Sequence, residues 1–151
     1  MHKRMKQLSA IIDPTADQLY ERVNLCIQIY NARREQITDE EIAKTRAFLS
    51  SDLYAMVSVC YLPALDDLIH TDIEMQKGDS RSYMEEFLKA RETYSISQAA
   101  DLARKTQKEN EIYVQTYKNF HNAKKIVNIY DKTMKMGSQV LNSMARRARE
   151  S

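Results

Sequence analysis

Glycine and proline are nearly absent from this chain, and their scarcity constrains the fold more than any other feature. The 151 residues include two glycines, Gly78 and Gly137, and two prolines, Pro14 and Pro63. A fold built from strands needs a turn after roughly every eight to twelve residues and usually places glycine or proline there, whereas long helices need few turns. We therefore predict an all-α fold, a helical bundle of five or six helices with a long C-terminal helix.

Helix start and stop signals give the expected boundaries of the first helices. The pair Asp13–Pro14 predicts a long helix starting nearby, because an acidic N-cap precedes a proline at the first helical position. Thr38 followed by Glu41 forms a capping-box pattern and predicts a second helix. Pro63 lacks an N–H group and clashes with the preceding turn, so we expect it to kink or end the second helix near residue 60.

A third helical segment is expected from residue 64. It should stop at Gly78, because glycine readily adopts the left-handed conformation of a helix C-terminal cap. Ser82 and Glu85 repeat the capping-box pattern and predict a short helix. Residues 98–104 are again strongly helical in composition.

The last expected helix carries the most regular apolar pattern, a heptad repeat over residues 112–144. The residues assigned to heptad position a are Tyr113, Phe120, Val127, Met134 and Leu141, and those assigned to position d are Thr116, Ala123, Tyr130, Gly137 and Met144. Such a pattern is typical of a helix that pairs with another helix. A continuous helix of this length would measure about 50 Å.

This apolar stripe favours a non-enzymatic interaction or assembly module, such as an adaptor, a chaperone-like subunit or a structural component of a complex. The chain would bind a protein partner or a second copy of itself. The predicted partner-binding residues are Tyr113, Phe120, Val127, Tyr130, Met134, Leu141 and Met144. The pattern leaves open whether the last helix folds back on its own bundle or projects from it.

Charge is distributed unevenly, although the net charge is only +2. Residues 7–75 contain five basic and twelve acidic side chains, whereas residues 104–151 contain eleven basic and four acidic ones. We divide the chain into a basic segment, 1–12, and a single helical domain, 13–151, with an acidic body over 13–95 and a basic arm over 96–151. The two parts either neutralise each other inside one bundle or mark a site for an acidic or polyanionic partner.

The basic arm supports an alternative function, nucleic-acid binding. Its binding residues would neutralise phosphates, so that affinity would fall as the salt concentration rises. The predicted contacts are Lys124, Lys125, Arg146, Arg147 and Arg149.

Residues suited to catalysis or metal binding are sparse. The three histidines, His2, His70 and His121, are far apart in the sequence and do not lie near a cysteine at a ligand-like spacing. Acidic pairs such as Glu40–Glu41 lack the Glu-x-x-His motifs of di-iron bundles, and no serine lies in a Gly-x-Ser-x-Gly motif. We therefore expect no enzymatic activity, no cofactor and no metal.

Compartment signals favour a cytoplasmic protein that does not span a membrane. Cys26 and Cys60 are the only cysteines, and both lie in apolar helical patterns that are typical of buried intracellular thiols. The basic N-terminus is not followed by the apolar core of a signal peptide. The longest apolar run, residues 53–65, is shorter than the roughly 20 residues that a spanning helix needs.

Overall fold

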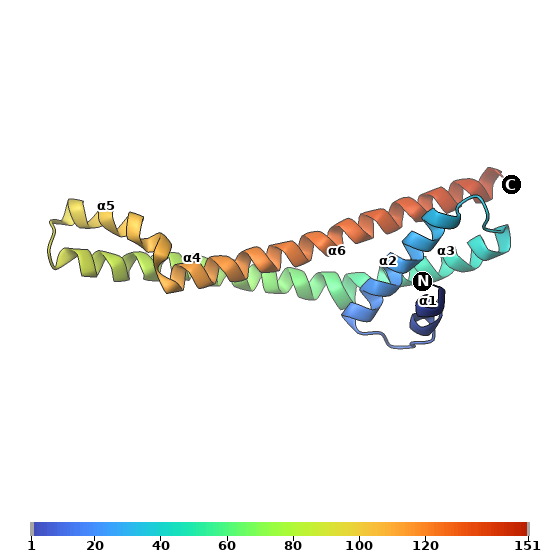
Figure 1. The fold of residues 1–151 in the computed structure, drawn as a ribbon, viewed down its shortest axis with the longest axis horizontal. Coiled ribbons are helices and arrows are strands. Elements are labelled where there is room, and N and C mark those ends of the chain that lie inside the picture. Colours follow the sequence, from blue (N-terminus) through green and yellow to red (C-terminus); the bar gives the residue numbers. More distant parts are fainter. Residues whose placement is uncertain (1, 151) are drawn as a thin grey trace. The chain divides into compact units, whose positions relative to one another are not determined.

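A computed structural model describes residues 2–150, and the regular structure in this range is entirely helical (Figure 1). The elements in chain order are α1 (His2–Ser9), α2 (Ala16–Arg33), α3 (Asp39–Met56), a π-helical turn η1 (Val57–Tyr61), α4 (Leu62–Arg91), α5 (Ile96–Thr106), a 3-10 turn η2 (Gln107–Glu109) and α6 (Glu111–Glu150). The predicted all-α fold and long C-terminal helix are confirmed. The heptad repeat within that helix stays a prediction from the sequence.

The chain forms two compact units. Unit 1 combines the residues up to Pro63 with those from Asn128 onward, and unit 2 comprises Ala64–Val127. The sequence predicts a single domain over 13–151 with a change of charge at residue 95, whereas the boundaries between the compact units fall after Pro63 and after Val127. Unit 1 therefore combines two separate stretches of the chain, whereas unit 2 is one continuous stretch.

Side-chain caps determine where α2 and α3 begin. The Thr15 hydroxyl accepts a hydrogen bond from the backbone N–H of Gln18, and the Gln18 side chain accepts one from the backbone N–H of Thr15. This reciprocal cap starts α2 just after the expected Asp13–Pro14. At the start of α3, Thr38 and Glu41 form the predicted capping box.

The core of unit 1 lies between α2, α3 and the last part of α6. The buried residues of this core are Leu19, Val23, Cys26, Ile27, Tyr30, Ile37, Ile42, Leu49, Met56, Cys60, Val140 and Met144. In α2 they recur at the three-and-four spacing expected of a buried helix face. Because Val140 and Met144 belong to this core, the end of the C-terminal helix folds back on its own chain.

A buried ion pair connects the first three helices. Arg22 of α2 forms two hydrogen bonds with the carboxylate of Asp52 in α3, at 2.8 and 2.7 Å. The same guanidinium donates to the backbone oxygens of Leu8 and Ile11, which end α1 and begin the following loop. Both charges are paired, and each of the three guanidinium nitrogens donates at least one hydrogen bond, so the two groups can be buried without a large unbalanced desolvation cost.

Pro63 does not end the second helix, so that part of the prediction is wrong. A π-helical turn, Val57–Tyr61, precedes the proline, and the N–H of Leu62 donates to the oxygen of Val57. In a regular α-helix the proline ring would clash with a carbonyl of the preceding turn. The π-helical turn is wider and changes the hydrogen-bond pattern at this point, so the helix can continue through the proline. The helical run consequently continues from Asp39 to Arg91.

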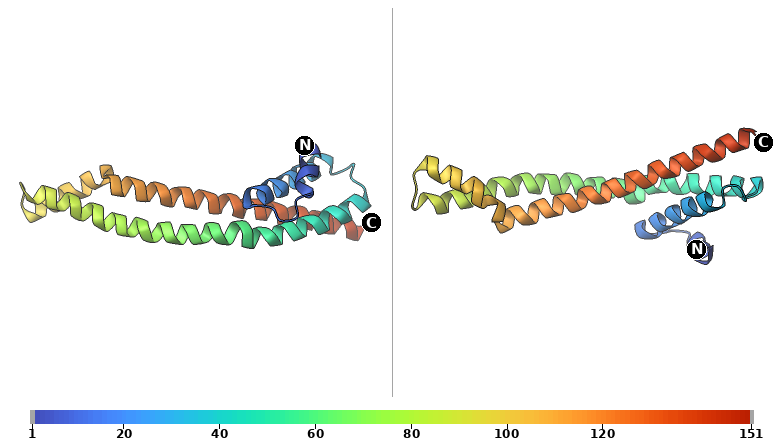
Figure 2. Two further views of the ribbon diagram at one scale, coloured as in Figure 1. Left: turned by 90° about the horizontal axis from the view of Figure 1, so that it is seen from below. Right: turned by 45° about the horizontal axis from the view of Figure 1, so that its top comes forward.

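In unit 2, α4 and the first part of α6 lie side by side, as both views in Figure 2 show. The buried residues of α4 are mostly small: Ala64, Gly78, Ser82 and Ala90. A Cβ atom on Gly78 would lie 2.5 Å from Oγ1 of Thr116 in α6, so the missing side chain permits this close approach. Gly78 is therefore not a C-terminal cap and Ser82 does not start a helix; both expectations are wrong, because tertiary packing uses these small residues inside α4.

Two polar side chains attach the turn between α5 and α6 to α4. The amide of Gln107 donates to the backbone oxygen of Asp79 at 2.7 Å and to the hydroxyl of Ser82 at 3.1 Å. Asn110 donates to the carboxylate of Glu86 at 2.9 Å. This hydrogen bond lowers the pKa of Glu86, because it stabilises the ionised carboxylate.

One helical stretch, Asp39–Arg91, is long and apolar enough to cross a membrane by length and composition alone, with a mean hydropathy of 1.4 in its most apolar window. Of that window, 33% is buried inside the protein. Core helices of soluble proteins meet the same criterion, and this stretch supplies Leu49 and Met56 to the core of unit 1. That the chain does not span a membrane stays a prediction.

Candidate functional site

The predicted partner-binding stripe of α6 faces largely inward. Met144 is fully buried and Val127 is buried, whereas Tyr113 and Phe120 are half-buried. The remaining stripe residues, Tyr130, Met134 and Leu141, pack against the core of unit 1. In this structure the apolar face of the last helix is therefore covered mainly by the chain itself, and a partner would need another surface or would have to displace these contacts.

The five cations predicted to bind nucleic acid do not come together on one unit. Lys124 and Lys125 are exposed on the part of α6 that belongs to unit 2, and the three arginines lie in unit 1. Arg147 donates to the backbone oxygen of Arg34 at 2.7 Å and to that of Ile37. It thus caps the C-terminal end of α2 and the loop that follows, where unpaired carbonyls attract a cation.

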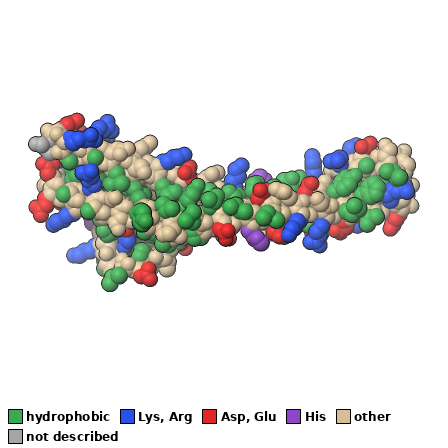
Figure 3. All heavy atoms as spheres, turned by 180° about the vertical axis from the view of Figure 1, so that it is seen from behind, with side chains coloured by type: hydrophobic (Ala, Val, Ile, Leu, Met, Phe, Trp, Pro, Cys, Tyr) green, Lys and Arg blue, Asp and Glu red, His purple; other side chains and the backbone are tan. Residues whose placement is uncertain are grey.

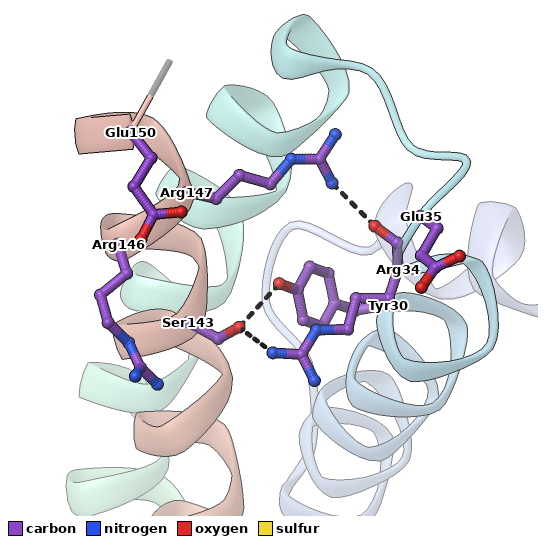
Figure 4. A pocket seen from close by; sticks show the side chains of 7 residues that line it. All are labelled: Tyr30, Arg34, Glu35, Ser143, Arg146, Arg147 and Glu150. Carbon is purple, nitrogen blue, oxygen red and sulfur yellow. Dashed lines mark hydrogen bonds between the residues drawn. The ribbon is translucent and has the colours of Figure 1, made fainter.

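A cleft of about 630 Å³ opens between the C-terminal end of α2 and the last turns of α6 (Figure 4). We call it the basic cleft. Its lining residues are Tyr30, Arg34, Glu35, Ser143, Arg146, Arg147 and Glu150. Three arginines and two glutamates leave the lining with a formal excess of one positive charge.

Hydrogen bonds hold the two walls of the basic cleft together. The Ser143 hydroxyl lies 3.0 Å from the hydroxyl of Tyr30 and accepts a hydrogen bond from Arg34 at 2.9 Å (Figure 4). Arg147, described above, bonds the end of α2 from the other wall. Four of the lining residues, Tyr30, Arg34, Ser143 and Arg147, are therefore held by specific contacts between α2 and α6.

Arg146 is the cation of this cleft that is available to a ligand. Among the residues that the structure describes, no hydrogen bond or ion pair engages its guanidinium. Arg34 donates from Nη2 to Ser143 and retains further N–H groups for a second acceptor. Two guanidinium groups on opposite walls can bind a carboxylate or phosphate through charge-assisted hydrogen bonds.

A smaller hollow of about 360 Å³ adjoins the basic cleft and shares four of its lining residues, Tyr30, Arg34, Ser143 and Arg146. The residues that only this hollow contains are Ile27, Asn31, Met136, Gln139 and Val140. Ile27 and Val140 are buried, and Met136 is the exposed large apolar residue of this lining. The two hollows together form an amphipathic groove along α6.

Part of this site is visible in the sequence and part is not. Ser143, Arg146, Arg147 and Glu150 recur at helical spacing, which places a polar row on one side of α6. The sequence analysis does not single out Tyr30, Arg34 or Ser143 as site residues. Nothing in the sequence signals that Arg34 meets a residue 109 positions further along the chain.

The two cysteines lack the properties of catalytic nucleophiles. Both are free and buried. Burial raises the pKa of Cys26 to about 11 and that of Cys60 to about 11, so the reactive thiolate is scarcely populated at neutral pH. Within residues 2–150, the structure places no three His, Cys, Asp or Glu side chains where they could share a metal ion.

The fold defines the class of this protein as an all-α protein with two compact helical units. No family model, curated protein or solved structure matches the chain. The candidate site therefore rests on the geometry of the basic cleft alone.

Proposed function

We propose that the chain is a non-enzymatic helical interaction module whose C-terminal helix binds an acidic, amphipathic segment of a protein partner in the basic cleft. The observation that supports this proposal is that Arg146, which has no hydrogen bond or ion pair among the described residues, lines a cleft of about 630 Å³ together with Arg34. An unpaired arginine beside a concave surface is suited to a carboxylate from outside the chain.

The composition of the groove favours a protein segment over a bare phosphate chain. Glu35 and Glu150 lie in the same lining and leave an excess of one positive charge, which matches a single carboxylate better than the several negative charges of a polyphosphate. Met136, which is exposed in the adjoining hollow, offers contact area to an aliphatic side chain. A partner segment with a carboxylate close to a leucine or methionine side chain would match both the arginines of the cleft and the apolar contact at Met136.

Binding should be of modest affinity. Exposed ion pairs contribute about 0.2–1 kcal/mol each. The cleft is open, so most of its charged contacts remain near water. We expect dissociation constants in about the micromolar range, with a clear loss of affinity as salt increases.

The test compares Arg146→Gln with a matched control, Arg149→Gln. Arg149 is exposed on the same helical end, and among the described residues its guanidinium donates to the backbone oxygen of Ala145 in its own helix. The probe is a fluorescent helical peptide of glutamate and leucine, followed by anisotropy at low and raised salt. Arg146→Gln should weaken binding by about tenfold and Arg149→Gln by less than about twofold. Equal effects of the two substitutions, or no binding by the unsubstituted chain, would contradict the proposal.

Nucleic-acid binding is the second candidate function. It is favoured by Lys124 and Lys125, which are exposed and have no acidic partner among the described residues. A retardation assay with single-stranded and duplex probes tests it at two salt concentrations. If lysines carry the binding, Lys124→Gln with Lys125→Gln should abolish it and Arg146→Gln should not. Retardation that is insensitive to both changes would exclude this surface.

A further inference from the structure

The outer face of α4 carries a second apolar row that no part of the described chain covers. The four large apolar residues of this row are exposed as follows: Ile69 55%, Ile73 47%, Met84 52% and Leu88 59%. They lie on the side of α4 opposite the small buried residues Ala64, Gly78 and Ser82, as the helical spacing requires. In the space-filling view, hydrophobic side chains are also exposed at the end of unit 2 that carries α5 (Figure 3).

Charged and polar residues complete this row at its ends and middle. In chain order the row is Asp66, Ile69, Ile73, Lys77, Ser80, Met84, Leu88 and Arg91, and all of these residues are exposed. The successive intervals are three, four, four, three, four, four and three residues. This alternation of three and four residues keeps a row on one face of a helix, as in a coiled-coil seam.

The row is symmetric when it is read from either end. The intervals are the same in both directions, and the four apolar residues occupy corresponding positions. An antiparallel copy would place Ile69 opposite Leu88 and Ile73 opposite Met84. Lys77 would lie opposite Ser80 near the centre, where Glu74 of the same helix already balances the lysine charge at 3.7 Å.

The charges at the two ends distinguish an antiparallel from a parallel arrangement. Asp66 would lie opposite Arg91 of the other copy, and the symmetry would form this pair twice. Arg91 donates from Nη1 to the backbone oxygen of Tyr94, which leaves other N–H groups for a carboxylate. A parallel arrangement would instead bring like charges together at each end, which is unfavourable.

We propose that the outer row of α4 binds the same row of a second copy of this chain, in an antiparallel and two-fold symmetric contact. A two-fold axis requires a self-complementary surface, and the symmetric row meets this requirement. The proposal does not rest on the basic cleft, because the two surfaces use different helices and share no residue.

The size of the contact sets the expected strength. The row from Asp66 to Arg91 spans about 37 Å of helix. A contact along one helix is narrower than a stable interface, which uses about 20–30 residues on each side. We therefore expect a reversible dimer whose population rises with concentration rather than a permanent one.

Sedimentation equilibrium of the full chain from about 1 to about 500 µM tests the association, because this range brackets micromolar dissociation constants. The substituted chain is Ile73→Glu, and the matched control is Val114→Glu, an exposed apolar residue of unit 2 on α6. Ile73→Glu should weaken dimerisation by about tenfold or more, and the control should leave it unchanged. A chain that stays monomeric throughout, or equal effects of both substitutions, would overturn the proposal.

A charge exchange separates pairing from a merely structural effect. Asp66→Arg or Arg91→Asp alone should weaken the dimer, because each creates like-charge contacts across the two-fold axis. The double exchange in one chain should restore dimerisation, since the opposite charges then meet again. Circular dichroism during thermal unfolding verifies that the variants remain folded. Failure of the double exchange in folded protein would overturn the antiparallel pairing.

Engineered cysteines test the direction of the two helices. Under mild oxidation, a mixture of Ile69→Cys and Leu88→Cys chains should form a disulfide-linked dimer. Either variant alone should cross-link poorly, because equivalent residues lie at opposite ends of the contact. The native thiols, Cys26 and Cys60, are buried and give little background. Efficient cross-linking of Ile69→Cys with itself would overturn the proposal.

Peptide binding to the basic cleft is measured separately in the Ile73→Glu chain. Failure of the dimer proposal therefore remains distinguishable from failure of the proposed function.

Discussion

At the scale of single residues, the buried pair Arg22–Asp52 is the polar contact on which unit 1 depends most. Both side chains are only 7% exposed. Arg22 also lies over the ring of Phe48, with its guanidinium carbon 4.9 Å from the ring centroid. Helical periodicity places Asp52 on the same helix as the apolar core residues, but it does not identify the arginine that neutralises it.

Replacing Asp52 by alanine should lower the free energy of unfolding by about 3–5 kcal/mol, because Arg22 would remain buried without a counter-charge. The matched control is Asp131→Ala, which removes an exposed ion pair with Lys135. That change should cost less than about 1 kcal/mol. Urea unfolding followed by circular dichroism gives both values, and similar losses for the two variants would contradict the assigned role of Asp52.

Glu41 provides a prediction about pH. The backbone N–H of Thr38 donates to its carboxylate, and this hydrogen bond is the main reason that the pKa of Glu41 lies below its usual 4.5. A lowered pKa in the folded state means that ionised Glu41 stabilises the fold above pH 4.5. This contribution is lost as the pH falls through the lowered folded value.

Glu41→Gln keeps a capping side chain but removes the titration. The unsubstituted chain should therefore be more stable than the variant at pH 7, and the difference should disappear in acid. Urea unfolding at a series of pH values checks this expectation. A difference that stays constant from neutral to acidic pH would show that the Glu41 charge has no part in the cap.

At the scale of elements, capping signals locate some helices and mislead at others. Thr38 and Glu41 mark the start of α3 correctly, because the signal and its hydrogen bonds are local. Gly78 and Ser82 resemble a stop and a start, yet both lie inside α4. Their small side chains serve the contact with α6, and single-sequence patterns do not report contacts between distant segments.

Gly78→Ala tests this contact. Alanine favours a helix by about 1 kcal/mol over glycine. Its Cβ would however lie 2.5 Å from Oγ1 and 2.8 Å from Cγ2 of Thr116, whose branched side chain cannot easily move. The substitution should therefore destabilise the chain by about 1–3 kcal/mol in spite of its higher helix propensity.

Gly137→Ala is the comparison for Gly78→Ala. A Cβ on residue 137 would lie 2.6 Å from the nearest terminal methyl group of Leu53. Because the leucine side chain is flexible, it can rotate away more easily than that of Thr116. Thermal unfolding should show the smaller loss for Gly137→Ala. Adding Thr116→Ala should recover much of the stability lost in Gly78→Ala. A stabilising Gly78→Ala would contradict the close helix contact.

At the scale of the whole molecule, the sequence predicts the helical class and the last helix but not how the segments assemble. The apolar stripe of α6 is evident from its spacing, and one of its residues, Met144, belongs to the core of unit 1. The pattern cannot distinguish a core within the same chain from a seam with a partner, because both bury the same side chains. The basic cleft is hidden for a related reason: Arg34 and Ser143 are far apart in the sequence.

The central claim is that the chain itself covers the apolar stripe of α6 and leaves the basic cleft and the outer row of α4 for binding. Hydrogen exchange of the backbone amides at high dilution is its most direct test. Amides of residues 134–144 should exchange slowly in the dilute, monomeric chain, and their rates should not depend on protein concentration. Rapid exchange on dilution, with protection returning only as the concentration rises, would show that this stripe is an intermolecular seam and would contradict the account.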